Sequence, residues 1–130
     1  MDWEAGQGHY PYQSAIDAYG NGGFRFADMS HKGSLIGLPS GMYAWDVNDP
    51  ADITLASLSR VMDAADEVDV LLIGTGPDIA AIPSDIRDAF RERGVIVEAV
   101  ATGSAVRTYN VLMNEKRAVA AALIAVEKAR

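Results

Sequence analysis

The sequence predicts an α/β protein with a mixed central sheet, whose parallel core strands are flanked by helices and preceded by an antiparallel β meander. Three observations carry this prediction. The first third alternates short apolar stretches with glycine-rich turns, as antiparallel strands do. Two later runs, at residues 68–73 and 95–101, have the predominantly apolar character of strands in a parallel sheet. Apolar residues at helical spacing surround both runs, which is typical of alternating helices and strands.

The meander is expected over residues 16–45. A Gly-Asn-Gly-Gly run at residues 20–23 supplies the positive-φ positions of a hairpin turn. Two more strands are expected at residues 33–38 and 41–45, where Pro-Ser-Gly interrupts the apolar pattern. We therefore expect an antiparallel unit that is distinct from the helical half of the chain.

The second half is expected to alternate helices and strands. Thr54 is placed to cap a helix before the strand at 68–73, and Ser84 to cap a short helix that stops at Gly94. A crossover through a single helix joins parallel strands with right-handed chirality. We therefore expect 68–73 and 95–101 to be adjacent, parallel and central in the sheet.

The last third of the chain contains a further helical pattern and an ambiguous tail. Val106, Asn110 and Met113 share one face of a helix that begins near Ser104. Asn110 is unfavourable inside a helix, so its side chain is expected to bond either a loop backbone or a site residue. Residues 117–126 are rich in alanine, which favours a helix, but their spaced apolar residues fit either period.

Composition restricts the classes of function. The chain has 130 residues, the size of one domain, and we expect a flexible lead-in at 1–14 and a single domain at 15–130. A net charge of −7 argues against a nucleic-acid partner, which requires a basic face. The absence of cysteine excludes disulfides and thiolate chemistry. No apolar run reaches membrane-spanning length and no signal peptide is visible, so we expect a cytoplasmic protein without membrane insertion.

A Gly-Thr-Gly sequence follows the first apolar run and invites comparison with phosphate-binding loops. Gly74 and Gly76 match the first two glycines of a dinucleotide fingerprint, but Ile79 occupies the third position and Pro77 intervenes. No lysine lies nearby to complete a P-loop. We interpret these glycines as a tight exit from a buried strand rather than a phosphate cradle.

A second Thr-Gly sequence follows the next apolar run and leads directly into a helix. If the two strands are parallel neighbours, both corners lie at the carboxyl edge of the sheet, where ligands usually bind. A helix N-terminus attracts anions, and an arginine one turn later adds positive charge. We therefore hypothesise a small-anion site formed by Thr75, Gly76, Thr102, Gly103, Ser104 and Arg107. The alternative is that Thr102 or Ser104 only caps its helix.

Other catalytic chemistry is sparse in the sequence. His9 and His31 lie in segments expected to be solvated, and no serine and carboxylate complete a triad. The acids between Asp46 and Asp52 lack the spacing of a calcium loop. We therefore expect no catalytic residues, no metal and no cofactor.

Several motifs, taken as a set, resemble one family. The stretches GNGGFRF, GSLIGLPSGMYAW, VLLIGTG and TGSAVRTYNVLMNEKRAVAAALI, in this order, are similar to the small Mth-like domain proteins. This family includes the adipogenesis-associated Mth-domain protein and a mitochondrial assembly factor of respiratory complex I. The resemblance covers about residues 16–126 and implies a single α/β domain, an extra β layer and a closing strand at 117–126. It implies no established catalytic residues.

The predicted function is therefore a non-enzymatic binding or assembly module with an unidentified protein partner. The resemblance adds a link to respiratory complex assembly. The alternative is a protein that binds a small molecule or anion through the paired Thr-Gly corners. A nucleotide-dependent enzyme is the third reading.

Overall fold

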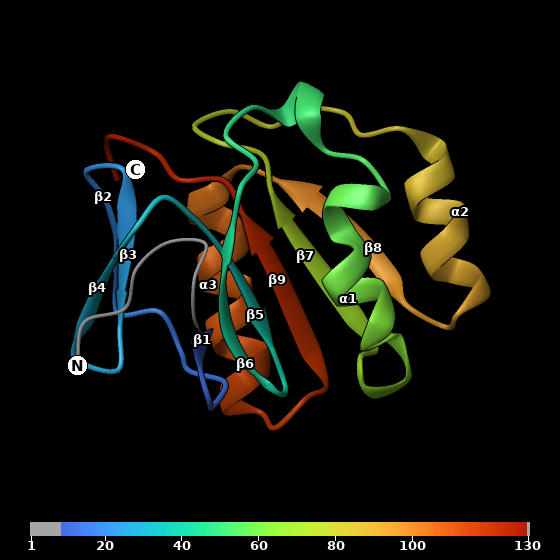
Figure 1. Cartoon of the computed structure of the whole chain (residues 1–130), viewed down its shortest axis with the longest axis horizontal. Coiled ribbons are helices and arrows are strands. Elements are labelled where there is room, and N and C mark those ends of the chain that lie inside the picture. The colour runs from blue at the N-terminus through green and yellow to red at the C-terminus, as the bar shows by residue number, and fades with distance from the viewer. Residues whose placement is uncertain (1–8, 130) are drawn as a thin grey trace.

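The computed structural model describes residues 9–129 and is built around a six-stranded mixed sheet (Figure 1). In spatial order its strands are β1 (His9–Tyr10), β6 (Gly41–Trp45), β5 (Ser34–Leu38), β9 (Val119–Leu123), β7 (Val70–Gly74) and β8 (Ile96–Val100). A separate antiparallel sheet consists of β2 (Ala18–Gly20), β3 (Gly23–Phe26) and β4 (Met29–Lys32). This second sheet confirms the extra β layer.

Helices cover both faces of the central sheet. The helical elements are η1 (Pro50–Asp52), η2 (Ala56–Leu58), α1 (Ser59–Asp63), η3 (Ala65–Glu67), α2 (Ser84–Glu92) and α3 (Thr102–Asn114). Helices α1 and α2 lie over one face, and α3 lies over the other beside the small sheet (Figure 1). None of the helices in the described part of the chain has the length and apolar character that crossing a bilayer requires.

The hairpin turn that was predicted at the glycine-rich run of residues 20–23 is confirmed. Asn21 and Gly22 have φ values of +53° and +78° between β2 and β3, which is the sign pattern of a type I′ turn. A second turn with two positive φ values, at Ala27 and Asp28, leads into β4, a strand that the sequence did not predict. The two strands expected at 33–38 and 41–45 are β5 and β6, and they belong to the central sheet.

The parallel pairing of the two apolar runs is confirmed, but their central position is only half correct. Strands β7 and β8 are parallel neighbours, in register from Val70 and Ile96 to Gly74 and Val100. Strand β8 lies at the edge of the sheet, because β9 takes the other side of β7 and connects it to β5. One face of β8 is correspondingly open, with Ile96 65% exposed.

The tail is a strand, as the resemblance implied. Helix α3 ends at Asn114, Lys116 has a φ of +61° in the following turn, and β9 begins at Val119. The alanines of β9 are fully buried, because helices or strands cover both faces of this strand. Small side chains fit between two covered faces, and this tertiary packing overrides the helix propensity of alanine.

The helix-capping predictions are correct in part. The N-cap of η2 is Leu55 rather than Thr54, although Thr54 and Ser57 bond each other reciprocally at the start of this segment. The segment breaks into η2, α1 and η3 instead of one helix. Gly94, with a φ of +82°, follows α2 as expected. Ser84 is not a cap but the first residue of α2, because Pro83 occupies the N-cap position.

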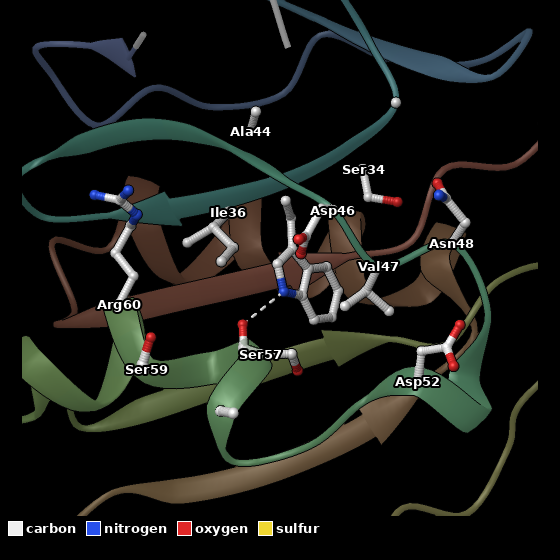
Figure 2. A pocket seen from close by; sticks show the side chains of 13 residues that line it. Ser34, Ile36, Ala44, Asp46, Val47, Asn48, Asp52, Ser57, Ser59 and Arg60 are labelled. Atoms are coloured by element: carbon white, nitrogen blue, oxygen red, sulfur yellow. Dashed lines mark hydrogen bonds between the residues drawn. The ribbon is translucent and has the colours of Figure 1, made fainter. Parts of the chain in front are cut away.

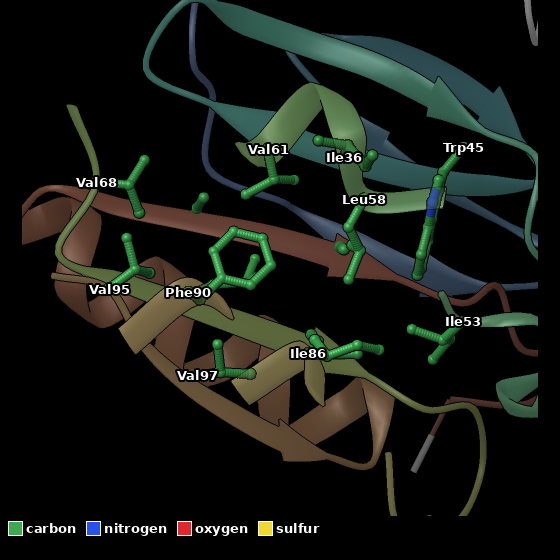
Figure 3. Close-up of a cluster of buried hydrophobic side chains, with 14 of the residues drawn as sticks. Ile36, Trp45, Ile53, Leu58, Val61, Val68, Ile86, Phe90, Val95 and Val97 are labelled. Atoms are coloured by element: carbon green, nitrogen blue, oxygen red, sulfur yellow. The ribbon is translucent and has the colours of Figure 1, made fainter. Parts of the chain in front are cut away.

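Two buried clusters hold the layers together. Phe90, Leu58 and Trp45 belong to the cluster between the sheet and helices α1 and α2 (Figure 3). Tyr109 belongs to the opposite cluster, which joins α3 and the small sheet to the central sheet. The Tyr109 ring lies over Gly37, where a Cβ would come within 2.7 Å of the hydroxyl. Burial raises the pKa of Tyr109, although a hydrogen bond with Gln13 opposes this shift.

The described part of the expected lead-in is bound to the body of the domain. Gln13 donates to the Val119 carbonyl at 2.7 Å, and the Tyr109 hydroxyl donates to the Ser14 carbonyl at 2.9 Å. The Asn110 side chain accepts from the Ile16 amide and donates to its carbonyl, both at 2.8 Å. Asn110 therefore bonds a loop backbone, the first of the two roles expected for it. Residues 1–8 lie outside the described residues.

Candidate functional site

The two Thr-Gly corners lie side by side at the carboxyl edge of the sheet. The register pairs Gly74 with Val100, and the Thr75 amide donates to the Val100 carbonyl at 2.8 Å. The Thr102 amide donates to the Gly76 carbonyl at 2.8 Å, which fixes the two corners to each other. Their expected proximity is therefore confirmed.

The Thr102 hydroxyl is part of this junction. It accepts from the Gly76 amide at 3.0 Å and donates to the Ile124 carbonyl at 2.7 Å. Thr102 is fully buried. Its side chain therefore ties β9 and the first corner to the start of α3 and does not face the small pocket described below.

The Thr75 hydroxyl closes its own loop. It donates to the Asp78 carbonyl at 2.8 Å and accepts from the Ala80 amide at 3.1 Å. Thr75 is 1% exposed. The loop after β7 is therefore held by internal bonds, as expected for a tight corner.

The other four residues of the hypothesised anion site surround one small pocket. This pocket, here called the corner pocket, has a volume of about 130 Å³. It is lined by Tyr19, Gly76, Pro77, Ala101, Gly103, Ser104, Arg107, Val126 and Lys128. None of these described lining residues is acidic, whereas two are basic, so the corner pocket has a local positive charge on a chain with a net charge of −7.

The helix at the corner pocket begins earlier than expected. Helix α3 starts at Thr102, with Ala101 as its N-cap, rather than near Ser104. The Gly103 and Ser104 amides therefore lie in the first turn, whose N–H groups have no acceptor within the helix. Arg107 donates to the Ser104 hydroxyl at 3.4 Å, which keeps its guanidinium at this end of the helix.

His31 does not occupy a solvated turn, which corrects the sequence-based expectation. It lies in β4, is 2% exposed, and its Nε2 is 2.9 Å from the Ser34 carbonyl. Burial lowers the pKa of His31, and the backbone hydrogen bond partly opposes this shift. The side chain of His9 lies outside the described residues.

The structure also contains a larger groove that the sequence does not predict. It has a volume of about 880 Å³ and lies between strands β5 and β6 and the segment that carries η1, η2 and α1 (Figure 2). We call it the Trp45 groove, because the Trp45 indole donates to the Ser57 carbonyl at 2.8 Å across its floor. Its charged lining residues are Asp46, Asp52 and Arg60. Within residues 9–129, no three His, Asp or Glu side chains lie close enough together to hold a metal ion.

Comparison with known proteins identifies relatives of the whole domain. Residues 16–124 match the model of a family described as "Protein of unknown function (DUF498/DUF598)". A mouse protein named NADH dehydrogenase (ubiquinone) 1 alpha subcomplex assembly factor 3 is 31% identical over 91% of the chain. The match spans 64% of that protein, so the mouse relative is longer than the region shared with this chain.

Solved structures share the fold. A Bartonella henselae protein described as an outer membrane protein is 51% identical, with a TM-score of 0.88 over 92% of this chain and 100% of that one. A Bordetella pertussis protein described as an Mth938-like domain is 28% identical, with a TM-score of 0.75 over 89% of this chain and 88% of that one. These comparisons confirm the resemblance drawn from the sequence motifs.

Proposed function

We propose that this chain, which belongs to the DUF498/DUF598 family of proteins of unknown function, is a non-enzymatic module that binds a protein partner. The observation that carries the proposal is its similarity, over nearly its whole length, to a protein named as an assembly factor. The environment of His31 supports it, because a buried imidazole bound to a main-chain carbonyl is poorly placed to serve as a general base.

Affinity purification from the native cell tests this proposal. The tagged chain should retain one protein partner in constant proportion after cross-linking and stringent washing, and mass spectrometry should identify it. A tagged protein of similar size and charge, expressed at the same level, is the control. If the tagged chain and the control protein recover the same proteins, the proposal that this chain binds a specific partner is contradicted.

We further propose that the partner belongs to a respiratory complex under assembly. The support is the name of the mouse relative, which refers to assembly of an NADH dehydrogenase. Deletion of the gene should lower the amount of assembled NADH dehydrogenase on a native gel, and expression of this chain should restore it. An unchanged amount of the complex would contradict this role and leave partner binding to be tested separately.

A second candidate function is binding of a small anion in the corner pocket. Its support is the combination of Arg107, Lys128 and the first turn of α3 around a pocket of about 130 Å³. A pocket of this size suits an inorganic anion or a single carboxylate. Such an anion would lie against Gly103 and Ser104, while the Thr75 and Thr102 hydroxyls keep the corners in place.

We also propose a cytoplasmic location. A sequence without cysteine suits a reducing compartment, where structural disulfides are rare. Fractionation of native cells with an antibody against the chain should find it with cytoplasmic markers, and recovery only with secreted proteins would contradict the proposal.

A further inference from the structure

The Trp45 groove has walls that are fixed before any ligand binds. The Trp45 indole is bonded to the Ser57 carbonyl, and Ser57 is bonded to Thr54 through both side chains. Asp49 accepts from the Ala51 amide and so caps η1 at the rim of the groove. A groove with fixed walls loses little conformational entropy on binding, which favours recognition of a specific ligand.

Charges of both signs line this groove at separate places. Figure 2 shows Arg60 on one side and Asn48 and Asp52 on the other, with Asp46 between them. All four residues are exposed. The Arg60 guanidinium carbon lies 4.3 Å from the centre of the Tyr43 ring, so a cation–π contact holds the positive end in place.

The chemistry of the groove indicates the kind of ligand. Its volume of about 880 Å³ lies near the upper end of the range of about 300–1,000 Å³ typical of ligand clefts, which is large for a single ion. A lone amine would complement only the acidic side and leave Arg60 unused. Beside Arg60, Ser59 presents a hydroxyl that can bond a peptide group. An extended peptide segment with charges of both signs satisfies all these features.

We propose that the Trp45 groove docks an extended segment of the protein partner. A lysine or arginine of this segment lies against Asp46 and Asp52, and an acidic residue farther along it meets Arg60. Complementary charges at both ends fix the direction and the register of the segment. This inference rests on the proposed function, because it specifies the chemistry of the partner that the module binds.

Selection of short random peptides displayed on phage, with the purified chain as bait, tests the inference. Enriched peptides should carry a lysine or arginine and an acidic residue at a constant spacing. Their affinity should fall at least about tenfold in the Asp46→Asn/Asp52→Asn variant, as expected when charge-assisted contacts are lost. Arg60→Gln should weaken the same peptides and relax the requirement for the acidic residue.

An Asp85→Asn/Glu115→Gln variant is the matched control. It changes the net charge by the same amount, at two exposed acids outside the groove lining, and should bind the selected peptides as the wild-type chain does. Failure to enrich any peptide, enrichment of peptides without a basic residue, or equal binding by both double variants would overturn the inference. A native partner that binds the Asp46→Asn/Asp52→Asn variant normally would overturn it while leaving the proposed function intact.

Discussion

Gly76 and Thr102 are joined by two hydrogen bonds across the two corners of the sheet. The Gly76 amide donates to the Thr102 hydroxyl at 3.0 Å, and the Thr102 amide donates to the Gly76 carbonyl at 2.8 Å. The same hydroxyl reaches the Ile124 carbonyl at the end of β9. One buried side chain thus connects three segments that are distant in the sequence.

Replacement of Thr102 by valine should destabilise the domain. Valine keeps the shape of the side chain but removes the hydroxyl that pairs with the Gly76 amide and the Ile124 carbonyl. Each buried group left unpaired should lower the unfolding free energy by about 1–3 kcal/mol. Urea unfolding measures the resulting decrease in the free energy of unfolding. Thr108→Val, at an exposed position of the same helix, is the control and should change the unfolding free energy by less than about 0.5 kcal/mol. Equal effects of the two substitutions would refute the structural role of Thr102.

Gly76→Ala should also destabilise the domain, for a different reason. Gly76 has a φ of +105°, a conformation that side chains rarely adopt, whereas the nearest atom to an added Cβ is 3.9 Å away. Backbone strain rather than a clash should therefore lower the unfolding free energy by on the order of 1 kcal/mol or more. Urea unfolding curves for the variant and the wild type would coincide if this conformation were not required.

The stability of the domain should depend on the protonation of His31. Burial lowers the pKa of His31 in the folded state, whereas the unfolded chain binds a proton near the ordinary pKa of 6.5. The contribution of neutral His31 is therefore complete above pH 6.5 and is lost as the pH falls from that value through the lower, folded-state pKa. Unfolding free energies measured across this range should decline less steeply with acidity in His31→Gln. Parallel pH profiles of the variant and the wild type would contradict this linkage.

Anion binding in the corner pocket should be visible in backbone amide NMR spectra. Addition of phosphate or sulfate should shift the amide signals of residues 103–106 more than those of residues 74–76, because only the former begin a helix at the pocket. Arg107→Ala should weaken the response. Arg117→Ala removes an exposed cation that does not line the pocket, and its response should match that of the wild type. Absence of shifts at residues 103–106 would eliminate the anion-binding candidate.

The sequence predicts the local elements better than their positions in the sheets. The pairing of β7 with β8 follows from two apolar runs joined by one short helix, and this pattern is local. The edge position of β8 depends on β9, which enters the sheet from the far end of the chain and whose alanines suggest a helix. Strand β4 was missed because its turn uses Ala27 and Asp28, neither of which signals a positive φ as glycine does.

For the candidate sites too, the sequence predicts the local features but not the tertiary contacts. The position of the two corners at one edge follows from the parallel strands, but the engagement of the Thr75 and Thr102 hydroxyls in internal bonds depends on tertiary contacts. The Trp45 groove has no sequence motif, because its walls come from two strands and a helical segment brought together by the fold. The bond from Trp45 to the Ser57 carbonyl, which defines its floor, is invisible before folding.

Native mass spectrometry of the chain isolated from its own cells tests whether this chain acts by holding a protein partner. We predict a complex of the chain with one protein partner, present in a fixed ratio. Dissociation of this complex should release the unmodified chain. Recovery of the chain alone, or with only a small molecule bound, would contradict the claim that it acts by holding a protein partner.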